Sequence, residues 1–243
     1  DSWSDPTSLA DALAKIESGY TIFIAAGTYT PSTTITNGNP DDVSDKTFEI
    51  DKYITVKGGF PKNPSEGATS DPKSNKTILS GNLGSGAEAY HVVTVTAPKQ
   101  DGKKVVIDGV TITRGNAYDR GNRITINDIS FSRGNGGGMN IGNSIVEILN
   151  TEIIENKTSG SGAQAGYSAG VFAHSASEVT FRNCKVNDNE ASGNGGGIWI
   201  DRSVAYIYDS EIKGNSSGTA GGVHGYPDAE VYVYNSTISE NKG

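Results

Sequence analysis

Residues 107–116, IDGVTITRGN, are followed nineteen positions later by residues 126–135, INDISFSRGN. Ile107 matches Ile126, and both stretches close on Arg-Gly-Asn. Apolar residues stand on alternate positions in both copies, which is the two-residue period of a β-strand. A strand pattern that repeats at so short a distance indicates that the two stretches are the same strand on successive coils of a solenoid.

The same phrase recurs further along the chain, if Gly109 and Asp128 are taken as equivalent anchors. The later anchors are Asn150, Asn183, Asp209 and Asn235. In all six copies the residues four before, two before and three after the anchor are apolar, although 34% of the chain is apolar. A second short strand precedes the phrase in the last four copies, which contain GGGMNI, AGVFAH, GGGIWI and GGVHGY. Each of these units therefore carries at least two short strands joined by Gly- and Asn-rich corners.

One such unit cannot bury its apolar side alone, but stacked units can, and their backbones then pair with the coils above and below. The sequence therefore predicts an all-β fold, a parallel β-helix, with neighbouring coils about 4.8 Å apart. The usual crossover between parallel strands predicts a right-handed coil. This register places Ile207 in the core and its neighbour Tyr206 on the outside.

We expect the chain to form a single β-helix domain over residues 1–243. Residues 1–20 form an N-terminal cap, residues 21–104 form irregular coils with long loops, and residues 105–243 form regular coils. No capping segment follows the last coil, so we expect a chain truncated at its C-terminus. We expect it either to continue into further coils or a C-terminal anchor domain, or to be closed by a partner.

The N-terminal cap is expected to be a short amphipathic helix within TSLADALAKIESG. Ser8 and Asp11 resemble a capping box. Leu9, Leu13 and Ile16 share one face of a helix, which can cover the apolar core and the strand edges of the first coil.

Composition excludes several classes of protein. The net charge of -8 argues against binding to nucleic acid or to anionic membrane surfaces. No apolar run is long enough for an integral membrane span. A single cysteine excludes an internal disulfide framework.

Five segments in order, IFIAAGTYTPS, ITVKGGFP, TILSGN, YHVVTV and VVIDGVTITRGNA, resemble secreted bacterial β-helix proteins of the pectin lyase-like superfamily. The later units NGGGMNI…EIIENK and NGGGIWI…EIKGNS resemble the repeats of polymorphic outer membrane proteins and related surface adhesins. The resemblance implies a right-handed parallel β-helix that is secreted or attached to the bacterial cell surface, in association with the outer membrane. It leaves activity open, because the superfamily includes polysaccharide lyases, glycoside hydrolases and proteins without known catalysis.

Two sets of corner residues are expected to form ladders, in which equivalent side chains hydrogen-bond from coil to coil. One set is Asp128, Asn150, Asn183, Asp209 and Asn235, and the other is Asn156, Asn189, Asn215 and Asn241. Cys184 occupies the slot of Thr151, Ser210 and Ser236, which predicts a structural thiol.

Arg114 and Arg133 are equivalent in this alignment and are expected on adjacent coils, with Glu155 next in line. They form either a solvated charge ladder or an anion site for acidic sugars. A polysaccharide lyase needs a base and a cation that stabilises the developing charge, and arginine can serve as that cation.

Aromatic side chains occupy outward positions of the last coils. Phe172, Trp199 and His224 align on one strand, and Tyr206 and Tyr232 align on the next, together with Tyr208 and Tyr234. These rings either stack only on one another or contact the apolar faces of sugars, because Tyr and Trp combine an apolar body with a polar tip.

The sequence identifies no catalytic residue, and His91, His174 and His224 do not share a slot that would suggest a triad or a metal cluster. We therefore expect no metal and no cofactor. The alternative is calcium, held by Asp188 and Glu190 or by Asp201 and Asp209.

These patterns favour a non-catalytic protein of the cell surface that serves in adhesion or glycan contact, with a polysaccharide or a host or cell-surface glycan as partner. The alternative is a polysaccharide lyase or glycoside hydrolase that acts on an acidic polysaccharide. The candidate ligand-binding residues are Phe172, Trp199, His224, Tyr206, Tyr232, Arg114 and Arg133.

Overall fold

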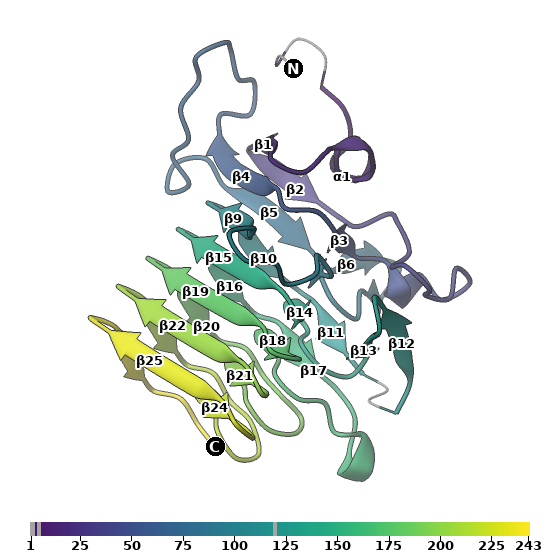
Figure 1. Cartoon of the computed structure of the whole chain (residues 1–243), viewed down its shortest axis with the longest axis vertical. Helices are drawn as coiled ribbons and strands as arrows, with labels where there is room; N and C mark the ends of the chain where they lie inside the picture. The colour runs from purple at the N-terminus through teal and green to yellow at the C-terminus, as the bar shows by residue number, and fades with distance from the viewer. Residues whose placement is uncertain (1–2, 4–5, 119–120) are drawn as a thin grey trace.

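A computed structural model describes residue 3, residues 6–118 and residues 121–243, without the side chain of residue 164. The chain winds into a stack of coils whose strands form three parallel sheets, with the two termini at opposite ends of the stack (Figure 1). The predicted parallel β-helix is confirmed, because neighbouring strands within each of these sheets are separated in sequence and pair in parallel.

Each sheet takes one strand from most coils. The first sheet contains β1 (Thr21–Ala25), β4 (Thr55–Phe60), β9 (Val105–Asp108), β15 (Ile145–Leu149), β19 (Glu178–Arg182), β22 (Val204–Tyr208) and β25 (Glu230–Tyr234). The second contains β2 (Gly27–Tyr29), β5 (Thr77–Ser80), β10 (Thr111–Thr113), β16 (Glu152–Ile154), β20 (Lys185–Asn187), β23 (Glu211–Lys213) and β26 (Thr237–Ser239). The third contains β3 (Phe48–Ile50), β8 (Val93–Val95), β14 (Met139–Gly142), β18 (Val171–His174), β21 (Ile198–Ile200) and β24 (Val223–Gly225).

Shorter elements decorate the corners. They are β6 (Asn82–Gly84) with β7 (Ala87–Glu88), β11 (Asn116–Ala117) with β17 (Lys157–Thr158), β12 (Arg123–Ile126) with β13 (Ile129–Ser132), and two 3₁₀ turns at Val43–Asp45 and Gly162–Gln164. Within the described residues, no helix is both long and apolar enough to cross a membrane.

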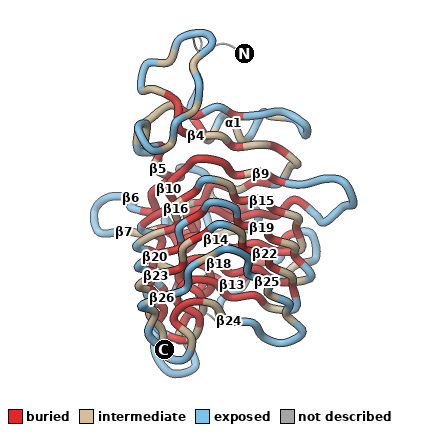
Figure 2. The backbone as a smooth tube through the Cα atoms, turned by 90° about the vertical axis from the view of Figure 1, so that its left-hand side faces the viewer, coloured by how far each residue is buried: buried red, intermediate tan, exposed pale blue. Residues whose placement is uncertain are grey.

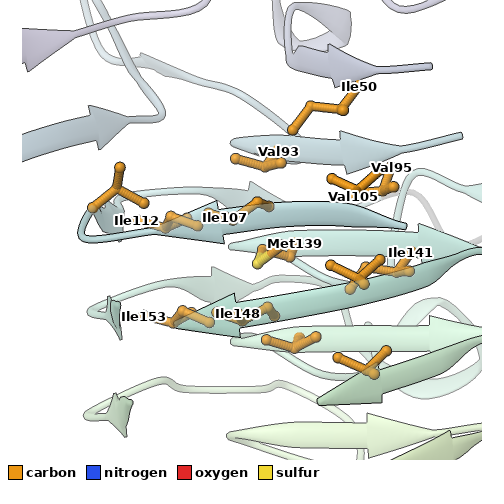
Figure 3. Close-up of a cluster of buried hydrophobic side chains, with 14 of the residues drawn as sticks. Ile50, Val93, Val95, Val105, Ile107, Ile112, Met139, Ile141, Ile148 and Ile153 are labelled. Carbon is orange, nitrogen blue, oxygen red and sulfur yellow. The ribbon is translucent and has the colours of Figure 1, made fainter. Parts of the chain in front are cut away.

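The core runs along the axis of the stack and is built from the alternate apolar residues of the strands (Figure 3). Ile148, Phe181 and Ile207 follow one another in register on β15, β19 and β22, and all three are almost fully buried. Figure 2 shows buried stretches within the coils and exposed loops around them. The predicted inward position of Ile207 is confirmed, and Tyr206 lies on the outer face.

The corner after each first-sheet strand from β9 to β25 requires a left-handed backbone. Asn150, Asn183, Asp209 and Asn235 have φ between 47° and 54°, and the equivalent Gly109 has a φ of 70°. Asn, Asp and Gly adopt this conformation more readily than other residues. The repeated anchors are therefore the residues that turn the chain from one sheet to the next.

The N-terminal helix α1 (Leu9–Lys15) is confirmed together with its cap. The backbone N–H of Asp11 donates to Ser8 Oγ, which in turn donates to the Asp11 carboxylate at 2.7 Å. Leu9 is buried in the core, and Leu13 and Ile16 pack against it. The helix thereby covers the first coil.

The nineteen-residue repeat has a different cause from the predicted one. Ile107 pairs with Val56 and Ile148, whereas Ile126 pairs with Ile129 in the antiparallel hairpin β12–β13. The two strands of the hairpin are joined by Asn127 and Asp128, with φ values of 50° and 62°. A two-residue turn with positive φ at both positions is a favoured hairpin turn. The prediction that residues 107–116 and 126–135 lie on successive coils is therefore wrong.

The hairpin packs on the outer face of the third sheet (Figure 1). A second small core forms there, from Ile35, Ile124, Ile126 and Phe131, with Ile129 against it. Phe131 lies so close to Gly142 of β14 that a Cβ added at that glycine would fall 2.5 Å from the ring. The hairpin therefore covers part of the third sheet, which would face solvent in a regular coil.

The asparagine ladder at the second corner is confirmed. Asn156, Asn189 and Asn215 are fully buried, and each donates from Nδ2 to the Oδ1 of the next asparagine at 2.9–3.0 Å, ending on Asn241. At the first corner, Asn183 donates to Asn150, and Asn150 donates to Asp108 at 2.8 Å. Asp128 was wrongly assigned to that corner, because it lies in the hairpin turn.

Cys184 is structural, as its slot predicts. Its backbone N–H donates to Ser210 Oγ at 3.0 Å, and the thiol is buried against the carbonyl oxygen of Ile148. Burial raises the pKa of the Cys184 thiol to about 11, so the reactive thiolate is disfavoured at neutral pH.

Candidate functional site

The predicted row on the third sheet is aligned as expected but does not face solvent. Phe172, Trp199 and His224 pair in register on β18, β21 and β24. Phe172 and Trp199 are nevertheless only 7% and 5% exposed, and His224 is partly buried. The prediction of an exposed row of flat groups is therefore wrong for the first two residues.

Other aromatic rings cover this row. The ring of Tyr167 stacks on Trp199, with centroids 4.4 Å apart and planes at 23°, and the ring of His174 stacks on Phe172 at 4.9 Å. Tyr167 belongs to the long insertion between β17 and β18, which falls outside the repeat. A periodic pattern carries no information on where such an insertion folds back, so the cover could not be predicted.

Trp199 lies at the centre of five rings, which we call the indole cluster: Tyr167, Phe172, Trp199, His224 and Tyr226. His224 lies 4.3 Å from the indole between ring centroids, and Tyr226 meets it edge to face at 6.5 Å. Tyr226 is 61% exposed, so it forms the outer wall of the cluster. The cluster combines a buried indole with an outer ring that is accessible to solvent.

The outer face of the first sheet carries a second set of rings, and these are exposed. Tyr206 stacks on Tyr232 at 5.2 Å with planes at 11°, and Tyr208 stacks on Tyr234 at 4.9 Å with planes at 9°. Tyr232 and Tyr234 are exposed, and Tyr206 and Tyr208 are partly exposed. We call these four residues of β22 and β25 the tyrosine face.

Polar groups border the tyrosine face. The guanidinium of Arg182 lies over the ring of Tyr208 at 4.4 Å and 3.8 Å from the Asp209 carboxylate. The hydroxyl of Tyr232 donates to Glu230 Oε2 at 2.8 Å, and this hydrogen bond raises the pKa of Tyr232. The face therefore offers flat apolar surface together with hydrogen-bond donors and acceptors.

Arg114 and Arg133 are not neighbours, contrary to the prediction. Arg114 is exposed at a corner with a φ of 62°, and its counterpart on the next coil is Glu155, with a φ of 55°. Arg133 follows the hairpin and is buried, where it forms a bidentate ion pair with Asp45 at 2.6 and 2.7 Å. Arg133 therefore pairs with the loop before β3 and does not stand in line with Arg114 and Glu155.

Sequence reasoning missed the polar cluster around this ion pair. The guanidinium of Arg133 lies 6.0 Å from the ring of Tyr90, whose hydroxyl donates to Asp42 at 2.9 Å. Burial and this hydrogen bond raise the pKa of Tyr90. The ion pair joins positions 88 residues apart, for which no local pattern exists.

A buried network of histidines lies under the hairpin. Asn140 bridges the two rings, at 3.5 Å from His91 Nε2 and 3.2 Å from His174 Nε2. Burial lowers the pKa of His91 to about 4 and that of His174 to about 3. Both rings are therefore neutral at physiological pH, and His174 also packs against Phe131 of the hairpin that covers the third sheet.

The acids considered for calcium do not converge. In the described part of the chain, no group of three or more His, Cys, Asp or Glu side chains is arranged to hold a metal ion. Asp201 instead pairs with Arg202 at 3.1 Å, and Asp209 accepts a hydrogen bond from Asn235.

No model of a known protein family matches this chain, and neither does any curated protein. Among solved structures, it is similar to a pectin methylesterase point mutant in complex with a hexasaccharide, at 13% sequence identity and a TM-score of 0.35. That match covers 98% of this chain and 88% of the other. A similarity of this size carries no argument about function, which has to come from the surface of the molecule.

Proposed function

We propose that this protein is a non-catalytic β-helix that binds glycan chains through the tyrosine face. The observation that carries the proposal is the pair of stacked, outward tyrosine rows on β22 and β25, whose outer rings Tyr232 and Tyr234 are 40% and 48% exposed. Exposed rings gathered on one face of a sheet are typical of contact surfaces.

The chemistry of the tyrosine face suits sugars. The rings offer apolar area to the C–H groups of a sugar, and their hydroxyls, with Glu230 and Arg182, can hydrogen-bond its hydroxyls. The stacks also hold the rings in place before a ligand arrives, so little side-chain entropy is lost on binding. Charge favours a neutral glycan, because Glu230 and Asp209 flank the face and Arg182 already lies against Asp209.

A location outside the bacterial cell or on its surface, with a role in adhesion, is part of this proposal. It rests on the resemblance, drawn from the sequence alone, of the NGGGMNI and NGGGIWI units to the repeats of surface adhesins. A polysaccharide-degrading enzyme remains the alternative. It loses one of its candidate cations, because Arg133 is buried in its ion pair with Asp45.

The proposal is tested by affinity electrophoresis in gels that contain neutral or acidic polysaccharides. The double variant Tyr206→Thr/Tyr232→Thr should bind about tenfold more weakly, because two ring contacts of about 0.5–1.5 kcal/mol are lost. Threonine suits a strand, and Thr180 already occupies the same row on the preceding coil. The matched control is Tyr20→Thr, at an exposed tyrosine near the N-terminus, which should leave binding unchanged.

The proposal is overturned if the wild-type protein is retarded by no glycan, or if the double variant and the control behave alike. Incubation of the protein with the same polysaccharides, followed by ultraviolet absorbance of unsaturated products, tests whether the protein is a polysaccharide lyase. Release of such products would replace the binding function with a lyase activity.

A further inference from the structure

The indole nitrogen of Trp199 lacks a hydrogen-bond partner. Among the residues that the structure describes, Trp199 Nε1 is the buried side-chain nitrogen or oxygen atom without one. The side chain is 5% exposed, so bulk water does not replace the missing acceptor. Buried polar groups in native proteins are almost always hydrogen-bonded, and each exception calls for an explanation. This N–H donor is therefore available to an oxygen or nitrogen acceptor of a ligand.

The surroundings of this donor restrict what the acceptor belongs to. Tyr167 and His224 lie at 4.4 and 4.3 Å from the indole between ring centroids, and Phe172 and Tyr226 meet it edge to face. Since Tyr167 and His224 already lie against the indole, the ring left to a ligand is that of Tyr226, which favours a ligand with a flat apolar face. The single N–H adds the need for one well-placed oxygen. A sugar ring has both features, since its C–H faces are apolar and its rim carries hydroxyls.

Two glycine-containing loops pass close to the rings of the cluster. A Cβ added at Gly195 would lie 3.0 Å from the indole, and one added at Gly193 would lie 2.9 Å from the ring of Tyr167. The glycines therefore allow two loops to pass close to the rings. Tyr226 is the exposed member, 61% accessible, and meets the indole edge to face, so a ligand that reaches Trp199 enters beside it.

We propose that the indole cluster is a second sugar site, in which Trp199 Nε1 donates a hydrogen bond to a hydroxyl oxygen of one sugar unit that enters beside Tyr226. This inference rests on the proposed function, because it takes the glycan bound at the tyrosine face as the source of the sugar. The two sites lie on neighbouring sheets, since β21 carries Trp199 and β22 carries Tyr206 and Tyr208.

The test follows the indole N–H itself by ¹⁵N–¹H NMR of the full chain. The protein has two tryptophans, so Trp3→Phe assigns the signal of Trp199. Oligosaccharides of the glycan that retards the protein most in gels are then added. The Trp199 signal should move downfield, because the donor gains an acceptor. The backbone signals of the N-terminal coil should not move.

The matched variant is Trp199→Phe, which removes the N–H and keeps an aromatic ring among its neighbours. It should bind the oligosaccharide about tenfold more weakly, the effect of one hydrogen bond. Its melting temperature should fall somewhat in either case, because the smaller ring loosens the cluster, so the binding measurement decides. A merely structural role for Trp199 would leave binding unchanged.

The inference and the proposed function fail in different ways. If the oligosaccharide binds and shifts the tyrosine signals, while the Trp199 signal stays in place and Trp199→Phe binds normally, the second site is overturned and the tyrosine face stands. If no glycan of the panel binds, both are overturned.

Discussion

The row of Phe172 and Trp199 and the row of Tyr206 and Tyr232 lie on neighbouring sheets and share the coil of β21 and β22, but only the second row reaches solvent. Both are outward positions of parallel strands, and both align from coil to coil. The first row is covered by Tyr167 and neighbouring rings, whereas Tyr232 remains 40% exposed. The difference teaches that strand alternation decides whether a side chain points inward or outward, but not whether an outward side chain reaches solvent.

The largest expected effect on stability comes from a substitution at an inward position of a strand, compared with one at the neighbouring outward position. Ile207→Asp places a carboxylate in the core, and we expect a loss of at least about 4 kcal/mol in the free energy of unfolding, measured with urea. Tyr206→Asp, one residue earlier on the outer face, should lose less than about 1.5 kcal/mol. Equal losses for the two variants would contradict the separation of inward and outward positions.

The next effect concerns the hairpin β12–β13, which covers part of the third sheet. Asp45→Asn leaves Arg133 buried without its counter-ion, which should cost about 3–5 kcal/mol. The matched control is Asp209→Asn at the exposed pair with Arg182, where the change should cost less than about 1 kcal/mol. Asparagine already serves the same corner at Asn150 and Asn183. Similar losses at the two sites would mean that the buried pair does not hold the hairpin in place.

The coils were predictable from sequence because their signals are local. The alternation in IWI and AYIY, together with an anchor that tolerates positive φ, repeats on every regular coil. The hairpin was missed because INDISFS shows the same alternation, and only the two-residue turn at Asn127 and Asp128 distinguishes it from a coil. In the candidate site the alignment of Trp199 was predictable for the same reason. Its cover was not, because Tyr167 stands in an insertion without a repeat.

The pH dependence of stability tests the histidine network under the hairpin. The folded pKa values of His91 and His174, about 4 and about 3, lie below the ordinary 6.5, so the unfolded state binds more protons between these values. Stability is therefore full above pH 6.5 and falls as pH drops through about 4 and about 3. For His91 alone the loss is roughly 3 kcal/mol.

The measurement is chemical denaturation at a series of pH values for wild type and His174→Gln. The variant should lose less stability than wild type on acidification, because one of the two titrating groups is absent. Parallel curves would show that His174 is not buried as a neutral ring.

A smaller effect is expected when the ring of Tyr167, which stacks on Trp199, is removed. In a Trp3→Phe background, Tyr167→Ala should shift the emission of Trp199 to longer wavelength and increase its quenching by acrylamide, because the stacked ring is removed. The loss in stability should be about 1–2 kcal/mol. Tyr20→Ala, at a remote exposed tyrosine, should leave the emission unchanged. Unchanged emission in the Tyr167 variant as well would mean that other groups bury the indole.

The central claim is that the tyrosine face is the surface that meets the glycan, and tyrosine-ring NMR tests it most directly. In protein with ¹³C-labelled tyrosine, a saturating oligosaccharide should shift the ring signals of Tyr206, Tyr208, Tyr232 and Tyr234 and leave that of Tyr20 in place. Shifts that spare these four rings while the oligosaccharide is bound would contradict the account, because the glycan would then lie on another face of the β-helix.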